Sequence, residues 1–476
     1  MTAISSDANE VRIESHQLQR VCTARLINAG ATVVFSGAAY DSRMVRPGQL
    51  FVALRGERTD GHRYLAQAVA NGAACLMVEK DHPATAVYDS PIPVIEVADT
   101  LDGLGALAGW YRDQFEVPFV AITGSNGKTT TKEMVAAALS AKYDVYKTPG
   151  NLNSRIGLPI SLFNMTKSAT AAVCELGMSS RGEIDALAKI VRPRYAVFTN
   201  IAPAHLESLG TIEEVAAAKF ELLEHLDSSG LAFFCGDDAI LARQAAELGP
   251  RALTYGIAHD ADLRGADLRV SEDGTRFRVD TGEDVFLPLF GRHNVYNALA
   301  ALSVARQMKV DMLAAVAALA VMESADHRSR IERAGTVAVI DDTYNANPQA
   351  MEAALLALAE YPSSRRRVAV IGDMLELGSR TAVFHEHVGE RVAELSLDLV
   401  VTVGELSKKI ASAASAAGVP SGHQLHFDGA DDCAQMVAGW SRPGDTILVK
   451  GSRGMALEKV VAALLSHYGA SHKEGA

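Results

Sequence analysis

Cysteine is scarce in this sequence, and its cysteines are not spaced as a metal-binding or redox pair. The chain has five cysteines without CxxC spacing, namely Cys22, Cys75, Cys174, Cys235 and Cys433. A scattered set of odd number does not form a disulfide framework, and it lacks the paired ligands of a zinc site. We therefore expect buried, reduced thiols, which are typical of a reducing compartment.

Long apolar runs and an excess of positive charge are also missing. No stretch approaches the roughly 20 apolar residues of a transmembrane helix. The first 15 residues, MTAISSDANEVRIES, lack the apolar core of a signal peptide. A net charge of −12 argues against a nucleic-acid partner, because such partners favour a basic surface. Anionic substrates are not excluded, since a local cluster of lysine, arginine and Mg²⁺ can override the global charge. We expect a cytoplasmic protein without a membrane span.

The sequence does contain a regular alternation of short apolar runs and amphipathic stretches. Its composition, 48% hydrophobic and 21% charged, is ordinary for a globular protein, and 476 residues suggest about three domains. The alternation predicts α/β domains with mostly parallel sheets. Residues 266–289 alternate apolar and polar side chains and predict a β-hairpin insertion. We place the domains at residues 1–99, 100–327 and 328–476.

A short glycine-containing loop, TGSNGKTTTKEM, follows the buried-strand run VPFVAITG. The common Walker pattern has a glycine five positions before its Gly-Lys pair, where this chain has Ile122, and the only earlier glycine of the loop is Gly124. Backbone N–H groups and the positive end of the following helix can nevertheless hold phosphate. Lys128 supplies a cation, and Thr129 is placed to bind Mg²⁺. A glycine-rich turn with a surface lysine is the alternative, but the GKTT tetrad favours nucleotide binding.

Two polar residues follow the next two predicted strands. Glu175 ends the strand in VCELGM, and His205 lies just past the next strand, in TNIAPAHLESLG. Because the carboxyl ends of parallel strands share one edge, we expect both residues near Thr129. Together they predict a Mg²⁺ site beside a triphosphate. Taken singly, each is equally well explained as a helix cap or a solvated loop residue.

Lys219 lies on the apolar stripe of a helix predicted at residues 211–227. Thr211 and Glu214 form the capping box that starts this helix. The stripe consists of Ile212, Val215, Ala216, Leu222, Leu223 and Leu226. A lysine among them is costly unless it is paired or extends its ammonium group to solvent. The second explanation is the usual one, and a functional role needs a reason to hold the nitrogen there.

Polar residues also follow three predicted strands in the last third of the chain, where ordinary turns are the alternative explanation for each. They are Asp342 and Tyr344 in VAVIDDTYNANP, Asp373 and Glu376 in VIGDMLELG, and Lys450, Ser452 and Arg453 in LVKGSRGM. Three polar strand ends on one sheet edge favour a binding face.

Taken together, these motifs resemble the Mur ligase family of peptidoglycan synthesis. The matching motifs occur in the family's order: GSNGKTT, GNLNSRIGLPISL, CELGMSSRGEID, NIAPAHLESLG, AKFELL, GRHNVYNALAA, DDTYNANP, GDMLELG and LVKGSRGM. The shortened loop is the family's form of phosphate loop. DSRMVRPGQLFVALRGERTDGH resembles the family's nucleotide-sugar-binding segment. The resemblance covers nearly the whole chain, and its combination of motifs is specific, although GKTT alone is not.

The resemblance implies three α/β domains. The first binds the UDP-sugar, the second is a P-loop-type ATPase domain, and the third is Rossmann-like, binds the incoming amine and closes on ATP. The implied ATP-binding residues are Gly124, Ser125, Asn126, Gly127, Lys128, Thr129 and Thr130, with Asn294 and Asn297 at adenine and Arg330 and Asp342 from the third domain. The implied Mg²⁺ ligands are Thr129, Glu175, His205 and Lys219, the last as a CO₂-derived carbamate. The implied substrate-binding residues are Ser42 and Arg43 for the uridine diphosphate end, Asn151, Asn153 and Ser154 for the muramoyl-peptide, and Asp373 and Glu376 for the acceptor. Ser329 departs from the family pattern, which has glycine before Arg330.

The activity implied is that of an ATP-dependent amide ligase in which Lys128, Lys219 and His205 are catalytic. DDTYNANP followed by GDMLELG favours the branch that adds D-alanyl-D-alanine to UDP-N-acetylmuramoyl-tripeptide, acting as a cytoplasmic monomer. Lysine and meso-diaminopimelate both remain open as the third residue of that tripeptide. The alternatives are the diaminopimelate- or lysine-adding ligase, whose DNPR-type signature is missing, folylpolyglutamate synthase, and an inactive nucleotide-binding regulator. The intact Lys128, Glu175, His205 and Lys219 argue against the regulator.

Overall fold

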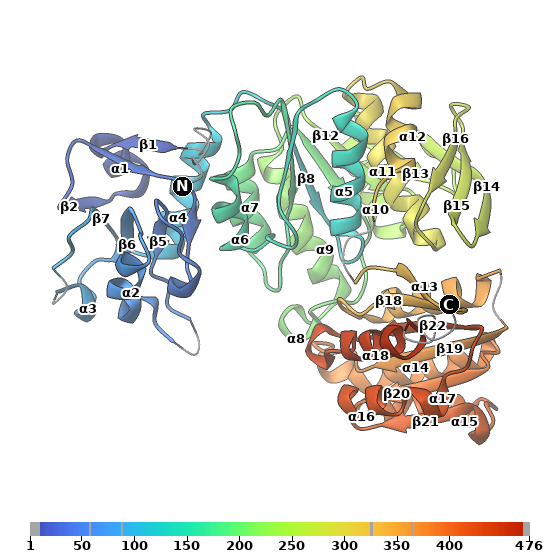
Figure 1. Cartoon of the computed structure of the whole chain (residues 1–476). Coiled ribbons are helices and arrows are strands. Elements are labelled where there is room, and N and C mark those ends of the chain that lie inside the picture. The colour runs from blue at the N-terminus through green and yellow to red at the C-terminus, as the bar shows by residue number, and fades with distance from the viewer. Residues whose placement is uncertain (1–9, 57–58, 87–88, 324–326, 363–364, 470–476) are drawn as a thin grey trace, which may run out of the picture. The chain divides into compact units, whose positions relative to one another are not determined.

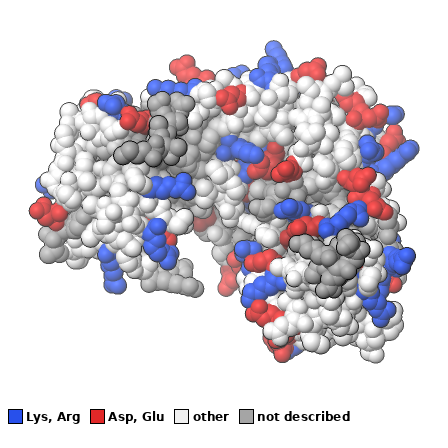
Figure 2. Space-filling view, in the orientation of Figure 1, with Lys and Arg blue, Asp and Glu red and all other residues white. Residues whose placement is uncertain are grey.

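The structure is α/β throughout, with mostly parallel sheets, as the alternation in the sequence predicts (Figure 1). It is a computed structural model that describes residues 10–56, 59–86, 89–323, 327–362 and 365–469. Residues 1–9, at the start of the segment predicted to lack a signal peptide, lie outside this range. No helix in the described ranges is long and apolar enough to cross a membrane. On the face shown in Figure 2, lysine and arginine are interspersed with aspartate and glutamate.

The chain divides into two compact units. The first consists of Met1–Ile122, Tyr143–Ala196 and Glu221–Gly230, and the second of Thr123–Lys142, Val197–Phe220 and Leu231–Ala476. The domain boundaries predicted at residues 99 and 327 stay a prediction. All five cysteines are free thiols, as expected. Four of them are buried, and Cys22 is half-buried.

The N-terminal sheet of the first unit has the strand order β2-β7-β6-β5-β4. Its strands are β2 (Arg25–Ile27), β4 (Ala38–Ala39), β5 (Leu50–Val52), β6 (Cys75–Glu79) and β7 (Val94–Val97). All pair in parallel except β2, which lies antiparallel at one edge. Every residue of β5 and β6 is buried, which is the pattern of parallel strands covered on both faces. A separate antiparallel pair is formed by β1 (Val11–Glu14) and β3 (Thr32–Phe35).

The helices of the first unit are short, and most connect its strands. They are α1 (Ser15–Cys22), α2 (Leu65–Ala70), α3 (Pro83–Ala86), α4 (Thr100–Arg112), α6 (Gly157–Leu162) and α7 (Glu183–Val191). Three 3₁₀ turns accompany them, η1 (Ser42–Met44), η2 (Gly61–Tyr64) and η3 (Glu221–His225). Asp99 starts α4 by accepting the N–H groups of Leu101 and Asp102.

The central sheet has the strand order β16-β15-β14-β13-β12-β11-β8-β10-β9. Its strands are β8 (Phe119–Thr123), β9 (Val145–Lys147), β10 (Ala171–Glu175), β11 (Tyr195–Phe198), β12 (Leu231–Cys235), β13 (Ala252–Gly256), β14 (Leu263–Ser271), β15 (Gly274–Val279) and β16 (Asp284–Leu287). The hairpin predicted at residues 266–289 is confirmed, since β14, β15 and β16 pair antiparallel in succession. The helices of this part of the second unit are α5 (Lys128–Ser140), α8 (Leu206–Leu209), α9 (Ile212–Phe220), α10 (Ala239–Leu248), α11 (Arg292–Gln307) and α12 (Met312–Ala320).

The C-terminal sheet, orange to red in Figure 1, has the order β17-β18-β22-β19-β20-β21. Its strands are β17 (Arg330–Ala334), β18 (Val337–Asp342), β19 (Arg366–Gly372), β20 (Leu399–Val403), β21 (Gln424–Phe427) and β22 (Asp445–Lys450). Only β17 is antiparallel to its neighbour. Its helices are α13 (Pro348–Glu360), α14 (Thr381–Glu394), α15 (Lys408–Ala416), α16 (Ala430–Gln435), α17 (Val437–Trp440) and α18 (Glu458–Gly469). Val460 and Leu464 of α18 pack on Val339 and Val370 of the sheet to form its core.

Candidate active site

Two glycines allow the phosphate loop to be shorter than the common pattern. Gly124 has a φ of 145°, and a Cβ there would lie 1.8 Å from Oγ1 of Thr199. Gly127, the residue before α5, has a φ of 77°, and its Cβ would lie 2.6 Å from Oδ1 of Asn297. Neither position tolerates a side chain, because the backbone is in a region that L-residues avoid and the space is filled. The close approach of Thr199 and Asn297 therefore sets the path of the loop.

Two neighbouring residues that the sequence analysis did not identify brace this loop. Asn200 accepts the N–H of Asn126 at 3.0 Å and donates its amide to the Asn126 carbonyl at 3.1 Å. The Ser125 N–H donates to the Asn200 carbonyl at 2.9 Å, and the Thr199 hydroxyl donates to the Asn126 carbonyl at 2.6 Å. Both bracing residues follow β11 directly, so the Thr-Asn pair at the end of a strand was the available signal.

Lys128 begins α5 and turns back over the loop. Its Nζ donates to the carbonyl oxygens of Gly124 at 2.9 Å and Ser125 at 3.2 Å. The next residue, Thr129, is buried in the first turn of the helix. A cation, the backbone N–H groups of a helix start and a hydroxyl thus lie on consecutive residues, as phosphate binding requires.

Lys219 is buried on α9 and does not reach solvent. Its exposed fraction is 2%. Burial, and secondarily the charge of Lys128, hold its pKa well below the usual value for lysine. No hydrogen bond or ion pair to its Nζ is recorded within the described residues, so the ammonium form has nothing to compensate its burial. Lys219 is thus buried beside Val215 and Ala216 of the predicted stripe, and its burial favours the neutral amine relative to the ammonium form.

The helix that carries Lys219 is shorter than predicted. α9 ends at Phe220, and residues 221–225 form the 3₁₀ turn η3. Where the helix ends, the Glu221 carboxylate accepts N–H groups of Gly182 and Asp185 at the start of α7. Thr211 caps the helix by accepting the N–H of Glu214 at 3.2 Å, as the capping box predicts. Leu222, Leu223 and Leu226 of the predicted stripe therefore lie beyond α9.

His205 and Glu376, predicted for different roles, are in direct contact. The His205 Nδ1 is 2.8 Å from Oε2 of Glu376, and the Glu207 N–H donates to the Glu376 carbonyl at 3.4 Å. Burial lowers the pKa of His205, as do the charges of Lys128 and Lys219, whereas Glu376 raises it. His205 is thus within electrostatic range of both lysines, which supports the prediction that these residues share a site.

Glu175 lies at the end of β10 in the first unit and is 1% exposed. Asn153 donates its amide to the Glu175 carboxylate at 2.6 Å, and the Glu175 N–H donates to the Thr148 hydroxyl at 3.1 Å. A predicted metal ligand and a predicted substrate residue are thereby joined. Glu175 and Thr129 belong to different units, so their convergence stays a prediction.

Asn294 and Asn297 are buried on α11 and contact the phosphate-loop helix. Asn294 donates to the Phe290 carbonyl at 2.7 Å and accepts from Asn297 at 3.1 Å. Asn297 in turn accepts the Thr131 hydroxyl at 3.1 Å. Their predicted contact with adenine is untested, but this chain of hydrogen bonds leads directly to α5.

Asp342, at the end of β18, is ion-paired within its own sheet. Lys450 donates to its carboxylate at 2.5 Å, and the Ser329 N–H donates to it at 3.0 Å. Ser329 has a φ of 51°, in the left-handed region that glycine adopts with least strain, which explains why glycine is expected there. Arg330 begins β17 and is exposed. The predicted nucleotide contacts of Asp342 and Arg330 stay predictions.

Asn347, another residue that the sequence analysis did not identify, joins the phosphate loop to α13. Asn347 caps α13 by accepting the Ala350 N–H at 2.9 Å, and its amide donates to Oδ1 of Asn126 at 2.6 Å. The amide of Asn126 donates in turn to Gln349 at 3.0 Å. The phosphate loop is therefore hydrogen-bonded to the start of α13.

The two residues predicted to bind the acceptor differ in exposure. Asp373 is 6% exposed, and its carboxylate accepts the Ser407 N–H at 2.7 Å. The Glu376 side chain is 62% exposed. Both roles stay predictions, but only Glu376 has a carboxylate that solvent reaches freely.

The residues predicted at the sugar nucleotide lie in the first unit. Ser42 is buried in η1 and donates to Gln67 at 2.7 Å. Arg43 is exposed and forms an ion pair with Asp41 at 2.6 Å. Ser154 accepts the N–H of Gly157 at 3.1 Å, at the start of α6. The carbonyl of Asn151 accepts the N–H of Asn153 at 2.8 Å. Their predicted substrate contacts are untested.

Three family models match consecutive parts of the chain. The Mur ligase family catalytic domain matches residues 35–111, the Mur ligase middle domain residues 122–305, and the Mur ligase glutamate ligase domain residues 327–453. The chain is 36% identical to UDP-N-acetylmuramoyl-tripeptide–D-alanyl-D-alanine ligase of Bacillus subtilis, across 91% of this chain and 93% of the relative. It is 38% identical to the Escherichia coli protein of the same name, across 91% and 95%.

A solved structure has the same fold along almost the whole chain. The crystal structure of MurF from Acinetobacter baumannii superposes with a TM-score of 0.85 and 32% identity, covering 96% of this chain and 99% of that one. The chain belongs to the Mur ligase family.

Proposed function

We propose that this chain is an ATP-dependent UDP-N-acetylmuramoyl-tripeptide–D-alanyl-D-alanine ligase. The observation that carries the proposal is the loop from Gly124 to Thr129, whose glycines allow the close approach of Thr199 and Asn297 and whose lysine turns back over it. Relatives of this name, 36% and 38% identical over nine-tenths of the chain, support the choice of reaction. The MurF ligase from Thermotoga maritima, 31% identical with a TM-score of 0.80, was solved in complex with ADP, which supports ATP as the nucleotide.

The reaction joins a carboxylate to an amine, and the carboxylate must first be activated because hydroxide is a poor leaving group. The tripeptide carboxylate attacks the γ-phosphorus of ATP, ADP leaves, and an acyl phosphate forms. The amine of D-alanyl-D-alanine attacks the acyl carbon, loses a proton, and inorganic phosphate leaves. Lys128 balances the negative charge that develops on the transferred phosphoryl group.

We assign the steps to the three predicted domains. Residues 1–99 bind the UDP end of the substrate through Ser42 and Arg43, residues 100–327 bind ATP, and residues 328–476 bind the dipeptide and close on ATP. The contacts of Asn126 with Asn347 and Gln349, and of His205 with Glu376, support communication between the last two. Because ATP is consumed and all five thiols are free, we propose a cytoplasmic location. We also propose that the chain is a monomer.

Thr129, Glu175, His205 and a carbamate on Lys219 would hold Mg²⁺, which would neutralise charge on the phosphates. The oxygen donors suit this cation, whereas imidazole is an unusual ligand for it. A neutral lysine adds CO₂ through its nitrogen and releases one proton, which yields an anionic carbamate. The burial of Lys219 and its lowered pKa support this modification.

The test is phosphate release measured with purified protein, ATP and a matrix of substrates. UDP-muramoyl-tripeptides ending in lysine or in meso-diaminopimelate are combined with D-alanyl-D-alanine, single amino acids or no acceptor. UDP-muramoyl-dipeptide with diaminopimelate or lysine, and a folate with glutamate, are assayed in parallel. We expect release only when a tripeptide and D-alanyl-D-alanine are both present. Release with UDP-muramoyl-dipeptide and diaminopimelate or lysine, or with a folate and glutamate, would overturn the proposal in favour of another ligase. No release with any pair would favour a regulator.

A further inference from the structure

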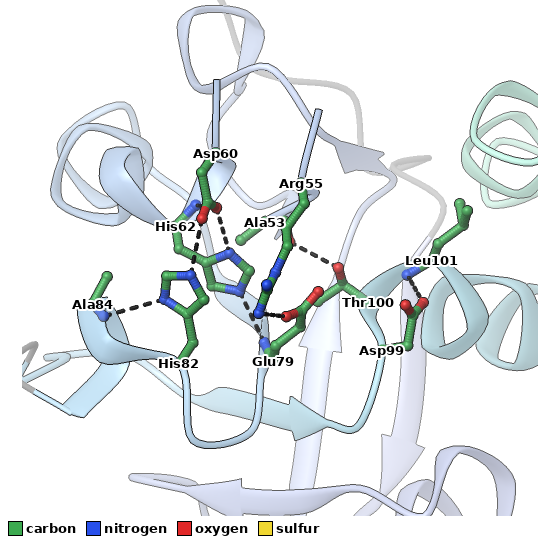
Figure 3. A network of polar contacts seen from close by, with 10 residues as sticks. All are labelled: Ala53, Arg55, Asp60, His62, Glu79, His82, Ala84, Asp99, Thr100 and Leu101. Atoms are coloured by element: carbon green, nitrogen blue, oxygen red, sulfur yellow. Dashed lines mark hydrogen bonds and ion pairs between the residues drawn. The ribbon is translucent and has the colours of Figure 1, made fainter. Parts of the chain in front are cut away.

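One aspartate and two histidines of the first unit form a cluster that the reaction proposed above does not use. Figure 3 shows that the carboxylate of Asp60, just before η2, contacts the rings of both His62 and His82. Nδ1 of His62 is 2.7 Å from Oδ1 of Asp60, and Nε2 of His82 is 2.9 Å from Oδ2. The two rings are stacked, with centroids 4.0 Å apart. The His62 side chain is fully buried, and that of His82 is 10% exposed.

Backbone hydrogen bonds determine the tautomer of each ring. The N–H of Glu79 donates to Nε2 of His62 at 2.9 Å, and the N–H of Ala84 donates to Nδ1 of His82 at 3.1 Å. Each of these nitrogens must carry a lone pair, so the proton of each neutral ring is on its other nitrogen, which faces Asp60. Asp60 therefore accepts a hydrogen bond from each ring, and a third from the His62 backbone N–H at 3.0 Å.

This arrangement is unfavourable for a metal ion, although the three candidate ligand atoms lie within 4.8 Å of one another. A metal on the nitrogen facing Asp60 would move the ring proton to the opposite nitrogen. That nitrogen would then carry a proton and face the backbone N–H of Glu79 or Ala84, so two hydrogen-bond donors would point at each other. A metal-binding histidine normally donates its second N–H to an acceptor, and here the second partner is a donor in both cases. The cluster is a completed hydrogen-bond network.

The network holds a loop that leaves β5 and returns at η2, of which residues 54–56 and 59–61 are described. The Gly61 N–H donates to the Leu54 carbonyl at 2.8 Å, and a Cβ on Gly61 would lie 2.8 Å from the Leu54 nitrogen. The backbone of Arg55 forms an isolated antiparallel β-bridge with that of Asp60, and the Arg55 side chain forms an ion pair with Glu79. From α4, the Thr100 hydroxyl donates to the Ala53 carbonyl at 2.8 Å. Asp60 therefore ties the returning arm of the loop to the end of β6.

The held arm leads to the surface where the sugar nucleotide is proposed to bind. Thr59, next to Asp60, is hydrogen-bonded to the Tyr64 hydroxyl at 2.9 Å. Tyr64 in turn lies within electrostatic range of Arg43. Large apolar or aromatic side chains are exposed around η1 and η2, namely Tyr40 at 53%, Met44 at 66% and Tyr64 at 39%. An exposed arginine beside aromatic rings suits a uridine diphosphate, which presents a planar base and two phosphates.

We propose that Asp60 is a positioning residue for the sugar-nucleotide substrate: through two neutral histidines it holds the Thr59–Tyr64 arm beside Arg43. This inference rests on the proposed function. It deepens that function, because it predicts that affinity for the sugar nucleotide depends on groups that do not touch it. It also predicts that this affinity falls in acid, since a protonated ring no longer accepts its backbone N–H.

The surroundings of His62 favour its neutral state. The titratable groups facing His62 are Asp60, His82 and Glu79, and Glu79 is paired with Arg55. Burial lowers the pKa of His62, as does the neighbouring His82, while both carboxylates raise it. Burial would raise the pKa of Asp60, but hydrogen bonds from His62 and His82 outweigh it and hold the value at about 2. Asp60 thus stays charged when acid protonates His62.

The test compares full-length variants by titration calorimetry of UDP-muramoyl-tripeptide without ATP, and by steady-state kinetics. Asp60→Asn replaces one carboxylate oxygen by an amide N–H that points toward one histidine. The Kd and KM for the sugar nucleotide should therefore rise about tenfold, which corresponds to the loss of a hydrogen bond to a charged group. The kcat and the KM for ATP should stay within about twofold. His16 is an exposed histidine on α1 of the same unit. His16→Gln is therefore the matched control, and it should leave the Kd, the KM values and kcat unchanged.

His82 supplies a rescue that a merely structural role would not give. Gln at position 82 places an uncharged N–H donor near the position of Nε2, so His82→Gln should keep the wild-type Kd at pH 7.5, whereas His82→Ala should raise it. In the wild type the Kd should rise as the pH falls from 7.5 to 5.5, because a protonated His62 no longer accepts the Glu79 N–H. If Asp60→Asn does not fold, as judged by thermal unfolding, the two His82 variants decide.

Equal losses in kcat and in both KM values, or a wild-type Kd that does not change as the pH falls from 7.5 to 5.5, would overturn the proposal. A stoichiometric Zn²⁺ site that is lost in Asp60→Asn would overturn it too, by showing a metal centre. An enzyme that ligates D-alanyl-D-alanine but fails these tests refutes this inference alone. A wild-type protein that binds no UDP-muramoyl-tripeptide and ligates nothing refutes the proposed function.

Discussion

The imidazole of His205 and the carboxylate of Glu376 meet at 2.8 Å, although 171 residues separate them in the sequence. His205 has a φ of 54° and Glu376 a φ of 63°, so both backbones adopt a left-handed conformation to make this contact. Gly378 packs against Glu207 in the same region, where its Cβ would lie 3.3 Å from the Glu207 Cα. The loop GDMLELG is therefore held against the segment that carries a predicted metal ligand.

Glu376→Gln should raise the KM for D-alanyl-D-alanine about tenfold and leave the KM for ATP within about twofold. The exposed carboxylate can attract the ammonium group of the dipeptide, and the amide cannot replace that charge. Steady-state kinetics with each substrate varied in turn is the measurement. Asp373→Asn is the comparison, and because Asp373 is buried and bonded to Ser407 it should also lower the melting temperature. A loss confined to ATP would assign the loop to the nucleotide site.

Lys128→Ala should abolish ligation and leave binding of UDP-muramoyl-tripeptide nearly unchanged. Lys128 contacts the phosphate loop, whereas the sugar nucleotide is assigned to the first domain. Activity is measured by phosphate release and binding by calorimetry. An equal loss of both would show that the domain roles are misassigned.

Lys219→Ala should lose nearly all activity without unfolding, and formate or acetate should restore part of it. The alanine leaves space in which a small carboxylate can replace the carbamate near the phosphates. Bicarbonate enriched in ¹³C, followed by NMR of the wild type, should show a carbamate signal that Lys219→Ala lacks. Full activity of Lys219→Met would contradict the carbamate, because methionine preserves only the apolar stem.

Gly124→Ala should weaken ATP binding strongly, because its Cβ would overlap Oγ1 of Thr199 in a backbone conformation that alanine avoids. Gly429→Ala is the control, since a Cβ there meets no atom within 4 Å. Nucleotide binding is measured by fluorescence titration and folding by circular dichroism. Unchanged nucleotide affinity in a folded Gly124→Ala protein would argue that the loop does not approach phosphate.

The melting temperature should fall as the pH drops from 7.5 to 5.5, in part through His385. Burial lowers the pKa of His385, which accepts the Met374 N–H at 3.0 Å and donates to the Thr381 carbonyl at 2.7 Å. Below its ordinary value of 6.5 the unfolded chain binds the proton more readily than the folded chain does, so stability is lost as the pH falls through this range. Scanning calorimetry of wild type and His385→Gln checks this: the variant should lose less between the two pH values, and an equal loss would exclude His385 as a contributor.

Local features were predictable from the sequence because they depend on residues a few positions apart. The spacing of Gly124, Gly127 and Lys128 predicts a phosphate loop, since strand, turn and helix follow one another directly. The periodicity around Lys219 predicts its apolar surroundings, and Thr211 predicts the start of its helix. The βα alternation likewise predicts parallel sheets, because a crossover helix returns the chain in the same direction.

The sequence by itself determined which elements form and which residues end the strands, since propensity and periodicity are local. Only the tertiary structure decided which of those residues meet. Asn200 braces the phosphate loop, Asn347 contacts Asn126, and His82 completes the network of Asp60. In each case the two residues are too far apart in the sequence for helix or strand periodicity to predict their contact. Such contacts depend on distances of about 3 Å and on which atom donates, and these are set by the packing of whole sheets and helices.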